Sequence, residues 1–135
     1  MAGVHDVAAY ILDRCGSMTA MKLQKLVYYS QAWSLVWDEA PLFHEKIQAW
    51  ANGPVVYEIF DAHRGSFTVA PPWTRGDAKR LAPNEAETID VVLENYGEMS
   101  GRQLSQLTHA EDPWRCTRGD LAPTARSNAE ITLEA

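Results

Sequence analysis

Cysteine and histidine are the residues of this chain whose chemistry most readily suggests a nucleophilic or metal site. Cys15 and Cys116 have no CxxC spacing, no nucleophile motif and no nearby run of histidines, which argues against a zinc site, a disulfide framework and a catalytic thiol. No HxxxH or HExxH pattern links the histidines, which are His5, His44, His63 and His109. We therefore predict two reduced thiols, no catalytic residue, no bound metal and no cofactor.

His109 is the polar side chain that most strongly suggests a binding role. With Thr108 and Trp114 it could form a recognition patch, in which the imidazole donates a hydrogen bond to a partner and the indole packs against that partner. Alternatively, His109 hydrogen-bonds the last carbonyls of its own helix beneath Trp114. A small hydrolase or transferase is a third interpretation, and it would require a deep pocket joining His109 to a carboxylate or a thiol.

A second candidate binding region surrounds the Gly53–Pro54 dipeptide, which is flanked by Trp50, Asn52 and Tyr57. In the functional interpretation these residues present an aromatic ring and an amide to a partner protein, because aromatic residues dominate binding energy at protein interfaces. In the alternative, the dipeptide only fixes the angle between the preceding segment and the next helix, and Trp50 covers the long helix described below.

Lys22 and Lys25 lie on one edge of the most apolar segment of the chain. One or both could pair with a buried or interfacial carboxylate, which makes them candidates for partner binding. The alternative is that their aliphatic stems lie along apolar surface while the ammonium groups reach water.

One long helix must position most of these side chains. Leu26, Tyr29, Trp33 and Val36 recur at steps of three and four, which predicts a helix from Ala20 to about Trp37. Ser17 or Thr19 is expected to cap its start. The remaining polar residues of this segment form a narrow strip (Gln24, Gln31, Ser34 and Asp38). A helix covered so heavily by apolar residues should be contacted from several sides.

Shorter helices are predicted around this one. The first runs from about Val4 to Arg14 and stops at Gly16, and the next begins at Gly53–Pro54, because proline suits the first helical position, and closes at Gly65. Capping patterns at Asn84 and Ser100 predict two more helices, over about 84–96 and 100–109, and 132–135 looks like the first turn of another.

Alternating apolar residues over 43–49, and the β-prone segment 66–69, predict two short extended segments that pair with each other. The predicted fold class is therefore mainly α: a compact helical domain around one central apolar helix (about 20–37), with a small β ribbon (about 43–49 and 66–69). No linker or repeat divides the sequence, so residues 1–135 are expected to form a single domain.

Composition sets limits on the partners. Of the 135 residues, 46% are hydrophobic, and the formal net charge is −6, so the chain lacks the positive charge that attracts proteins to phosphate backbones. We expect no direct nucleic-acid partner, whereas a basic protein would be steered towards this chain. No leader-like start and no apolar run approaching the roughly 20 residues of a membrane span are recognised, so a cytoplasmic location is expected.

Four blocks of residues, taken together and in order, resemble a known family. They are 22–29 (KLQKLVYY), Ala32–Trp33, 49–56 (AWANGPVV), and Leu107–His109 with Pro113–Trp114. In this order the blocks are similar to the Panacea domain of the SocA-like antitoxins, and they cover about 18–114. Relatives tend to continue into a further C-terminal helix, whereas this sequence ends at Ala135.

The resemblance implies a mostly helical antitoxin, encoded beside a toxin and neutralising it by direct protein contact. Toxins of this family's members include enzymes of the small alarmone synthetase type and a sliding-clamp inhibitor that its antitoxin delivers to a bacterial protease. The cognate toxin is therefore the expected partner, with an AAA+ protease as a second partner if this chain is a proteolytic adaptor. Residues expected to contact the toxin are Trp50, Asn52, Tyr57, His109, Trp114, Lys22 and Lys25.

The predicted helix over about 84–96 also has an acidic outer side, formed by Glu87, Asp90 and Glu94, with Glu98 just beyond it. This side is expected to be a solvated face. Alternatively, if the toxin acts on a nucleic acid or a nucleotide, its active site would be basic, and these carboxylates could occupy that site or steer the encounter.

Overall fold

The computed structural model describes residues 3–51, 53–111, 117 and 130–131, and helices predominate among them. The helices are α1 (Val4–Cys15), α2 (Ala20–Trp37), α3 (Tyr57–His63), the 3-10 helix η1 (Ala78–Arg80), α4 (Pro83–Tyr96) and α5 (Gly101–His109). The strands are β1 (Met18–Thr19), β2 (Ile47–Trp50), β3 (Gly53–Val56), β4 (Thr68–Val69) and β5 (Glu130–Ile131). Within the described residues, none of the helices has the length and apolar character needed to span a bilayer.

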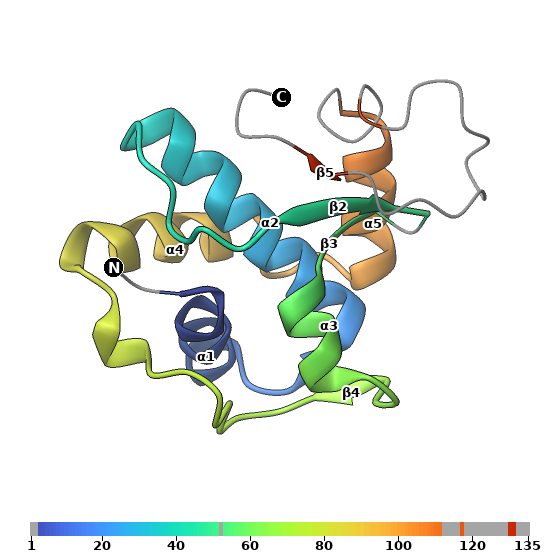
Figure 1. Ribbon diagram of the computed structural model, residues 1–135, viewed down its shortest axis with the longest axis horizontal. Helices are drawn as coiled ribbons and strands as arrows, with labels where there is room; N and C mark the ends of the chain where they lie inside the picture. Colours follow the sequence, from blue (N-terminus) through green and yellow to red (C-terminus); the bar gives the residue numbers. More distant parts are fainter. Residues whose placement is uncertain (1–2, 52, 112–116, 118–129, 132–135) are drawn as a thin grey trace.

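Helix α2 runs through the centre of the molecule, and the other α-helices surround it (Figure 1). Its first turn is capped by Thr19, whose hydroxyl accepts a hydrogen bond from the Lys22 N–H at 3.1 Å. Leu23 and Leu26 are completely buried at the middle of the hydrophobic core. The prediction of a central helix ending at Trp37 is confirmed.

Three of the four residues in the polar strip of α2 are internal, and the fourth, Asp38, is exposed. Gln24, Gln31 and Ser34 are buried, and each hydrogen-bonds the backbone of another segment. The Gln31 carboxamide accepts from the Leu42 N–H at 2.7 Å and donates to the Phe43 carbonyl at 2.9 Å. These side chains therefore satisfy backbone groups that would otherwise be buried without partners, and they hold chain segments against the central helix.

Two small antiparallel sheets accompany the helices. In one, the strand order is β3-β2-β5, with Ile47 opposite both Val56 and Ile131. In the other, β1 pairs with β4. The prediction that 43–49 pairs with 66–69 is wrong: Ile47–Trp50 pairs with β3 and β5, whereas the Phe67 carbonyl accepts the Ala20 N–H at 2.9 Å and fixes β4 beside the start of α2.

The predicted helix start at Gly53–Pro54 is also wrong. These residues begin strand β3, and α3 starts three residues later at Tyr57. Gly53 has a φ of +116°, which lies outside the range of a helix and favours glycine. Pairing with β2 and hydrogen bonds from α2 hold Pro54 and its neighbours extended, so tertiary contacts outweigh the local helix signal.

The remaining helices agree with the predicted positions apart from one cap. At α5 the Ser100 hydroxyl accepts the Gln103 N–H at 3.1 Å, and the Gln103 carboxamide accepts the Ser100 N–H at 2.8 Å, which confirms the predicted capping box. Helix α4 is capped at Ala82 instead of Asn84, and the Glu85 carboxylate accepts the Ala82 N–H at 2.8 Å. Pro83 occupies the first helical position, so the start lies earlier than the Asn84 signal predicted.

Candidate functional site

The β2–β3 hairpin and the helix that follows it create the candidate site. Trp50 lies opposite Gly53 at the end of the hairpin, and the chain passes from β3 directly into α3 at Tyr57. Because strand and helix adjoin without a loop, the side chains at the end of β2 meet those on the outer side of α3. Two of the predicted binding residues, Trp50 and Tyr57, are thereby brought to one surface.

We call the surface formed by Trp50, Tyr57, Phe60 and Arg64 the aromatic corner. The Phe60 ring lies between the other two rings, 4.9 Å from that of Trp50 and 5.9 Å from that of Tyr57. Arg64 covers the Phe60 ring at 5.2 Å and donates a hydrogen bond to the Tyr57 hydroxyl at 2.7 Å. Tyr57 is 42% exposed and Arg64 is also exposed, so the cluster presents aromatic and cationic groups to solvent.

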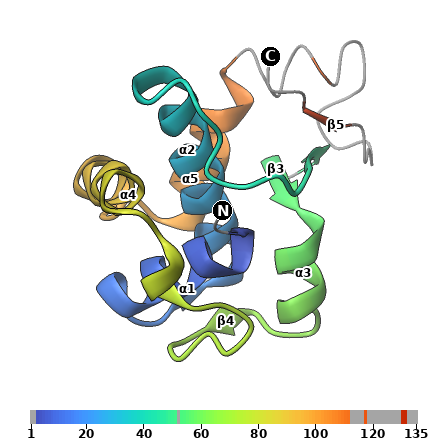
Figure 2. The ribbon, with the colours of Figure 1, turned by 60° about the vertical axis from the view of Figure 1, so that its left-hand side comes forward.

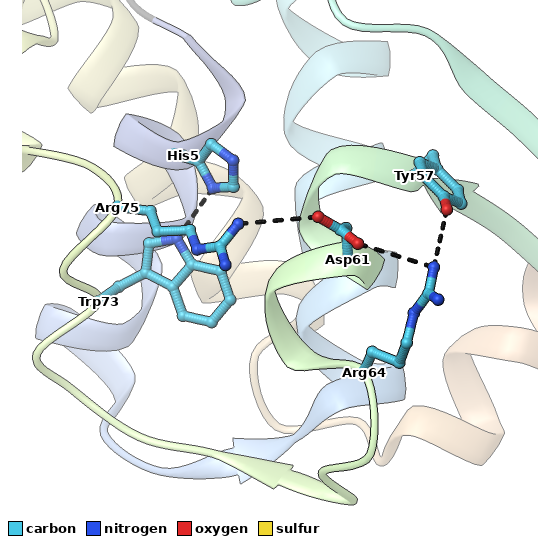
Figure 3. Close-up of polar contacts among 6 residues, drawn as sticks. All are labelled: His5, Tyr57, Asp61, Arg64, Trp73 and Arg75. Carbon is cyan, nitrogen blue, oxygen red and sulfur yellow. Dashed lines mark hydrogen bonds and ion pairs between the residues drawn. The ribbon is translucent and has the colours of Figure 1, made fainter.

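Asp61 links the aromatic corner to the segment before η1, and a separate hydrogen bond links that segment to helix α1 (Figure 3). One Asp61 oxygen lies 3.6 Å from Arg64 and the other lies 3.9 Å from Arg75. In the same view the Trp73 indole N–H donates to Nδ1 of His5 at 3.2 Å. These ion pairs are about half exposed, so they add little stability, but they restrict the orientation of Arg64.

Beneath the aromatic corner, two α2 side chains hold strand β3. Gln24 accepts from the Val56 N–H at 2.9 Å and donates to the Val56 carbonyl at 3.2 Å, as a neighbouring strand would. The Lys25 ammonium donates to the Pro54 carbonyl at 3.2 Å. Lys25 is only 1% exposed, and burial lowers its pKa to about 7. The edge of β3 that faces α2 is therefore occupied.

Two histidines near the corner, His63 and His5, have lowered pKa values, which favours their neutral forms. Gln24 Nε2 lies 3.1 Å from Nε2 of His63, and burial lowers the pKa of His63, with the Lys25 charge adding to the effect. Burial also lowers the pKa of His5, and Arg75 contributes in the same direction. A neutral His63 ring can accept the Gln24 amide hydrogen, which is consistent with a structural role.

Three other predicted binding residues, Lys22, Lys25 and His109, are described and are not part of the corner. Lys25 is buried and its ammonium holds β3, so it does not offer a contact surface. The Lys22 ammonium donates to the Gly97 carbonyl and ties α2 to the end of α4. His109 is half-buried at the last position of α5. Asn52 and Trp114 lie outside the described residues, as does the predicted helical turn at 132–135.

Metal-binding groups and thiol reactivity can be compared with the predictions for the described residues. Within the ranges 3–51, 53–111, 117 and 130–131, there is no group of three or more His, Cys, Asp or Glu side chains arranged to hold a metal ion. Partial desolvation raises the pKa of the Cys15 thiol, which lowers its nucleophilicity near neutral pH. On the acidic side of α4, Asp90 is already engaged within the molecule. Its carboxylate accepts a hydrogen bond from the Tyr10 hydroxyl at 2.6 Å and forms an ion pair with Arg14 at 3.6 Å.

Sequence reasoning missed two members of the corner. Phe60 and Arg64 were not among the residues predicted to contact a partner. Counting from Tyr57 gives the spacing of three and then four that places Phe60 and Arg64 on the same side. This spacing is visible in the sequence once the helix is known to begin at Tyr57, whereas the predicted start was Gly53–Pro54.

Comparisons with known proteins give the following matches. The family model described as Antitoxin SocA-like, Panacea domain matches residues 23–115. A relative named Antitoxin SocA, from Caulobacter vibrioides (strain NA1000 / CB15N), is 30% identical over 124 residues, covering 80% of this chain and 66% of that protein. The alignment thus spans just under two thirds of the relative's length. No solved structure matches the chain significantly.

Proposed function

Because the chain belongs to the Antitoxin SocA-like, Panacea domain family, we propose that it is an antitoxin that neutralises a protein toxin by binding it through the aromatic corner. The observation that carries this proposal is the cluster of Trp50, Tyr57, Phe60 and Arg64, in which Tyr57 and Arg64 are exposed and the Trp50 and Phe60 rings are half-buried beside them. Trp, Tyr and Arg are the residue types most enriched among those that dominate binding energy. The elements that form the corner lie within the part of the chain matched by the family model.

Preorganisation supports the choice of this surface. The Trp50 indole N–H donates to the Gln48 carboxamide at 2.7 Å, and the Arg64 guanidinium is held by Tyr57 and Asp61. Each long side chain that is already ordered saves about 0.5–1.5 kcal/mol of entropy on binding. Neutralisation at cellular concentrations generally calls for nanomolar affinity, about −12 kcal/mol, so a rigid aromatic centre is a better candidate than scattered surface charges.

A growth-rescue assay tests the proposal. The product of the neighbouring gene is expressed as the candidate toxin, with and without this protein, and complex formation is measured by co-purification. We expect the double variant Tyr57→Ala/Arg64→Ala to bind at least about thirtyfold more weakly and to lose rescue. Phe67→Ala is the matched control, because Phe67 is 81% exposed and lies outside the corner. Wild-type rescue by the double variant would exclude this surface.

Toxin half-life separates simple inhibition from delivery to a protease. If the chain only inhibits, the half-life of the co-expressed toxin should be unshortened, and rescue should persist in a strain without AAA+ proteases. A toxin that disappears faster when this protein is present would instead support the adaptor alternative. Absence of both rescue and complex formation would reject the antitoxin proposal itself.

A further inference from the structure

The C-terminal end of α2 carries an exposed apolar surface that the core does not use. Val36 is 63% exposed and Trp37 is 47% exposed. The Trp37 ring stacks on that of Trp33 at 4.7 Å, and the Trp33 indole N–H donates to the Tyr96 hydroxyl at 3.1 Å. Val36 belongs to the apolar spacing that predicted the helix, yet its side chain is exposed. The two indoles are thus held in place while one of them stays open to solvent.

Negative charge surrounds this surface. The last turn of α2 contains no basic residue, so no side chain offsets the partial negative charge of its terminal carbonyls. Asp38 and Glu39 follow immediately, and both are exposed. The Asp38 carboxylate accepts the Thr88 hydroxyl at 2.7 Å, whereas Glu39 forms no hydrogen bond or ion pair with the described residues. Charge and exposed indole therefore lie within one turn of each other.

We infer that the end of α2, comprising Trp33, Val36, Trp37, Asp38 and Glu39, is a second docking surface, which binds a cationic peptide segment of a partner protein. A cation is attracted both by carboxylates and by the face of an exposed indole, whose ring quadrupole is negative over the ring plane. Val36 would accept an aliphatic residue beside that cation. The same charges repel phosphate groups, so nucleic acid and anionic lipid do not fit this surface.

This surface lies apart from the aromatic corner. Figures 1 and 2 both place the C-terminal end of α2 well away from α3. A partner at one surface therefore leaves the other accessible. The inference does not depend on the antitoxin proposal, because it concerns different residues and a partner defined only by its charge and apolar character.

Peptide titration of the full chain tests the inference. The probe is a synthetic peptide of alternating arginine and leucine, and the control probe alternates glutamate and leucine. Binding is followed through the indole ¹H–¹⁵N resonance of Trp37. We expect saturable shifts with the first peptide and none with the second. Equal responses to both peptides, or no response to the cationic peptide, would overturn the inference.

Three variants make the test specific. Trp37→Ala, followed through the neighbouring Trp33 resonance, should weaken binding at least about fivefold, and Glu39→Gly should weaken it about threefold. Glu39 has a φ of +53°, a conformation that glycine adopts without strain, so Glu39→Gly should unfold at no lower temperature than the wild type. The control Glu58→Gln removes an equal charge from α3 and should bind as the wild type does. Loss of affinity in this control, or unchanged affinity in Trp37→Ala, would contradict a local site.

Discussion

Replacing Lys25 by methionine tests the account of the buried support beneath the aromatic corner. Lys25 is 1% exposed, its ammonium has the Pro54 carbonyl as its hydrogen-bond acceptor at 3.2 Å, and no carboxylate of the described residues forms an ion pair with it. Desolvation lowers its pKa from 10.5 to about 7. Methionine has a similar length and carries no charge, so the exchange removes the charge while keeping most of the packing.

The sign and size of the effect follow from proton linkage. Between pH 7 and 10.5 the unfolded chain holds a proton on Lys25 that the folded chain releases, so the free energy of unfolding rises with pH across this window. The difference between the two pKa values corresponds to about 4–5 kcal/mol of destabilisation near and below pH 7, falling by about 1.4 kcal/mol per pH unit towards 10.5. In the variant, loss of the hydrogen bond from Lys25 to the Pro54 carbonyl lowers the stability by about 1 kcal/mol, which offsets part of the gain from removing the buried charge.

Urea unfolding of both proteins at pH 7 and pH 9 measures this effect. At pH 7 we expect Lys25→Met to be more stable than the wild type by about 2–4 kcal/mol. At pH 9 that advantage should shrink by about 2 kcal/mol, because releasing the Lys25 proton on folding costs the wild type less free energy at higher pH. Other titrating groups are common to both proteins and cancel in the difference. A constant difference between the two pH values, or a variant less stable at both, would refute the reasoning.

Three further substitutions test two contacts beneath the corner and the cap of α5, and each is measured by chemical unfolding. Gln24→Leu should cost about 2–4 kcal/mol, because both backbone groups of Val56 lose their partner inside the core. Gly53→Ala should cost about 2 kcal/mol or more, because φ is +116° and an added Cβ would lie 2.5 Å from Cε of Lys25. A smaller loss of stability would mean that the Lys25 side chain can move aside at little cost. Ser100→Ala should cost about 0.5–2 kcal/mol through loss of the α5 cap, and an unchanged stability would show that the cap is dispensable.

The sequence predicted those parts of the fold that are governed by local signals. The bounds of α2 follow from the Thr19 cap and from apolar spacing, and the start of α5 follows from a side-chain capping box. Both signals act within a few residues, so they can be recognised without knowledge of the tertiary structure. The positions of Trp50 and Tyr57 beside one dipeptide likewise predicted that they would share a surface.

Features that depend on distant contacts were not predictable in this way. The Gly53–Pro54 dipeptide is a good local signal for a helix start, but pairing with β2 and the Gln24 carboxamide hold this segment extended. In the same way, nothing local indicated that Thr68 would pair beside the start of α2 instead of with the segment 43–49. Exposure at the end of α2 also depends on where the covering helices stop, which apolar spacing alone does not reveal.

The block 22–29 illustrates why a sequence motif can mark a family without marking a contact surface. Gln24 and Lys25 lie in this block, and both are buried against strand β3. Their side chains fix the strand that leads into α3, and α3 in turn carries Tyr57 and Arg64. Substituting the buried pair should therefore alter partner binding only through the position of the corner. The partner residues themselves should be sought on α3 and at the end of β2.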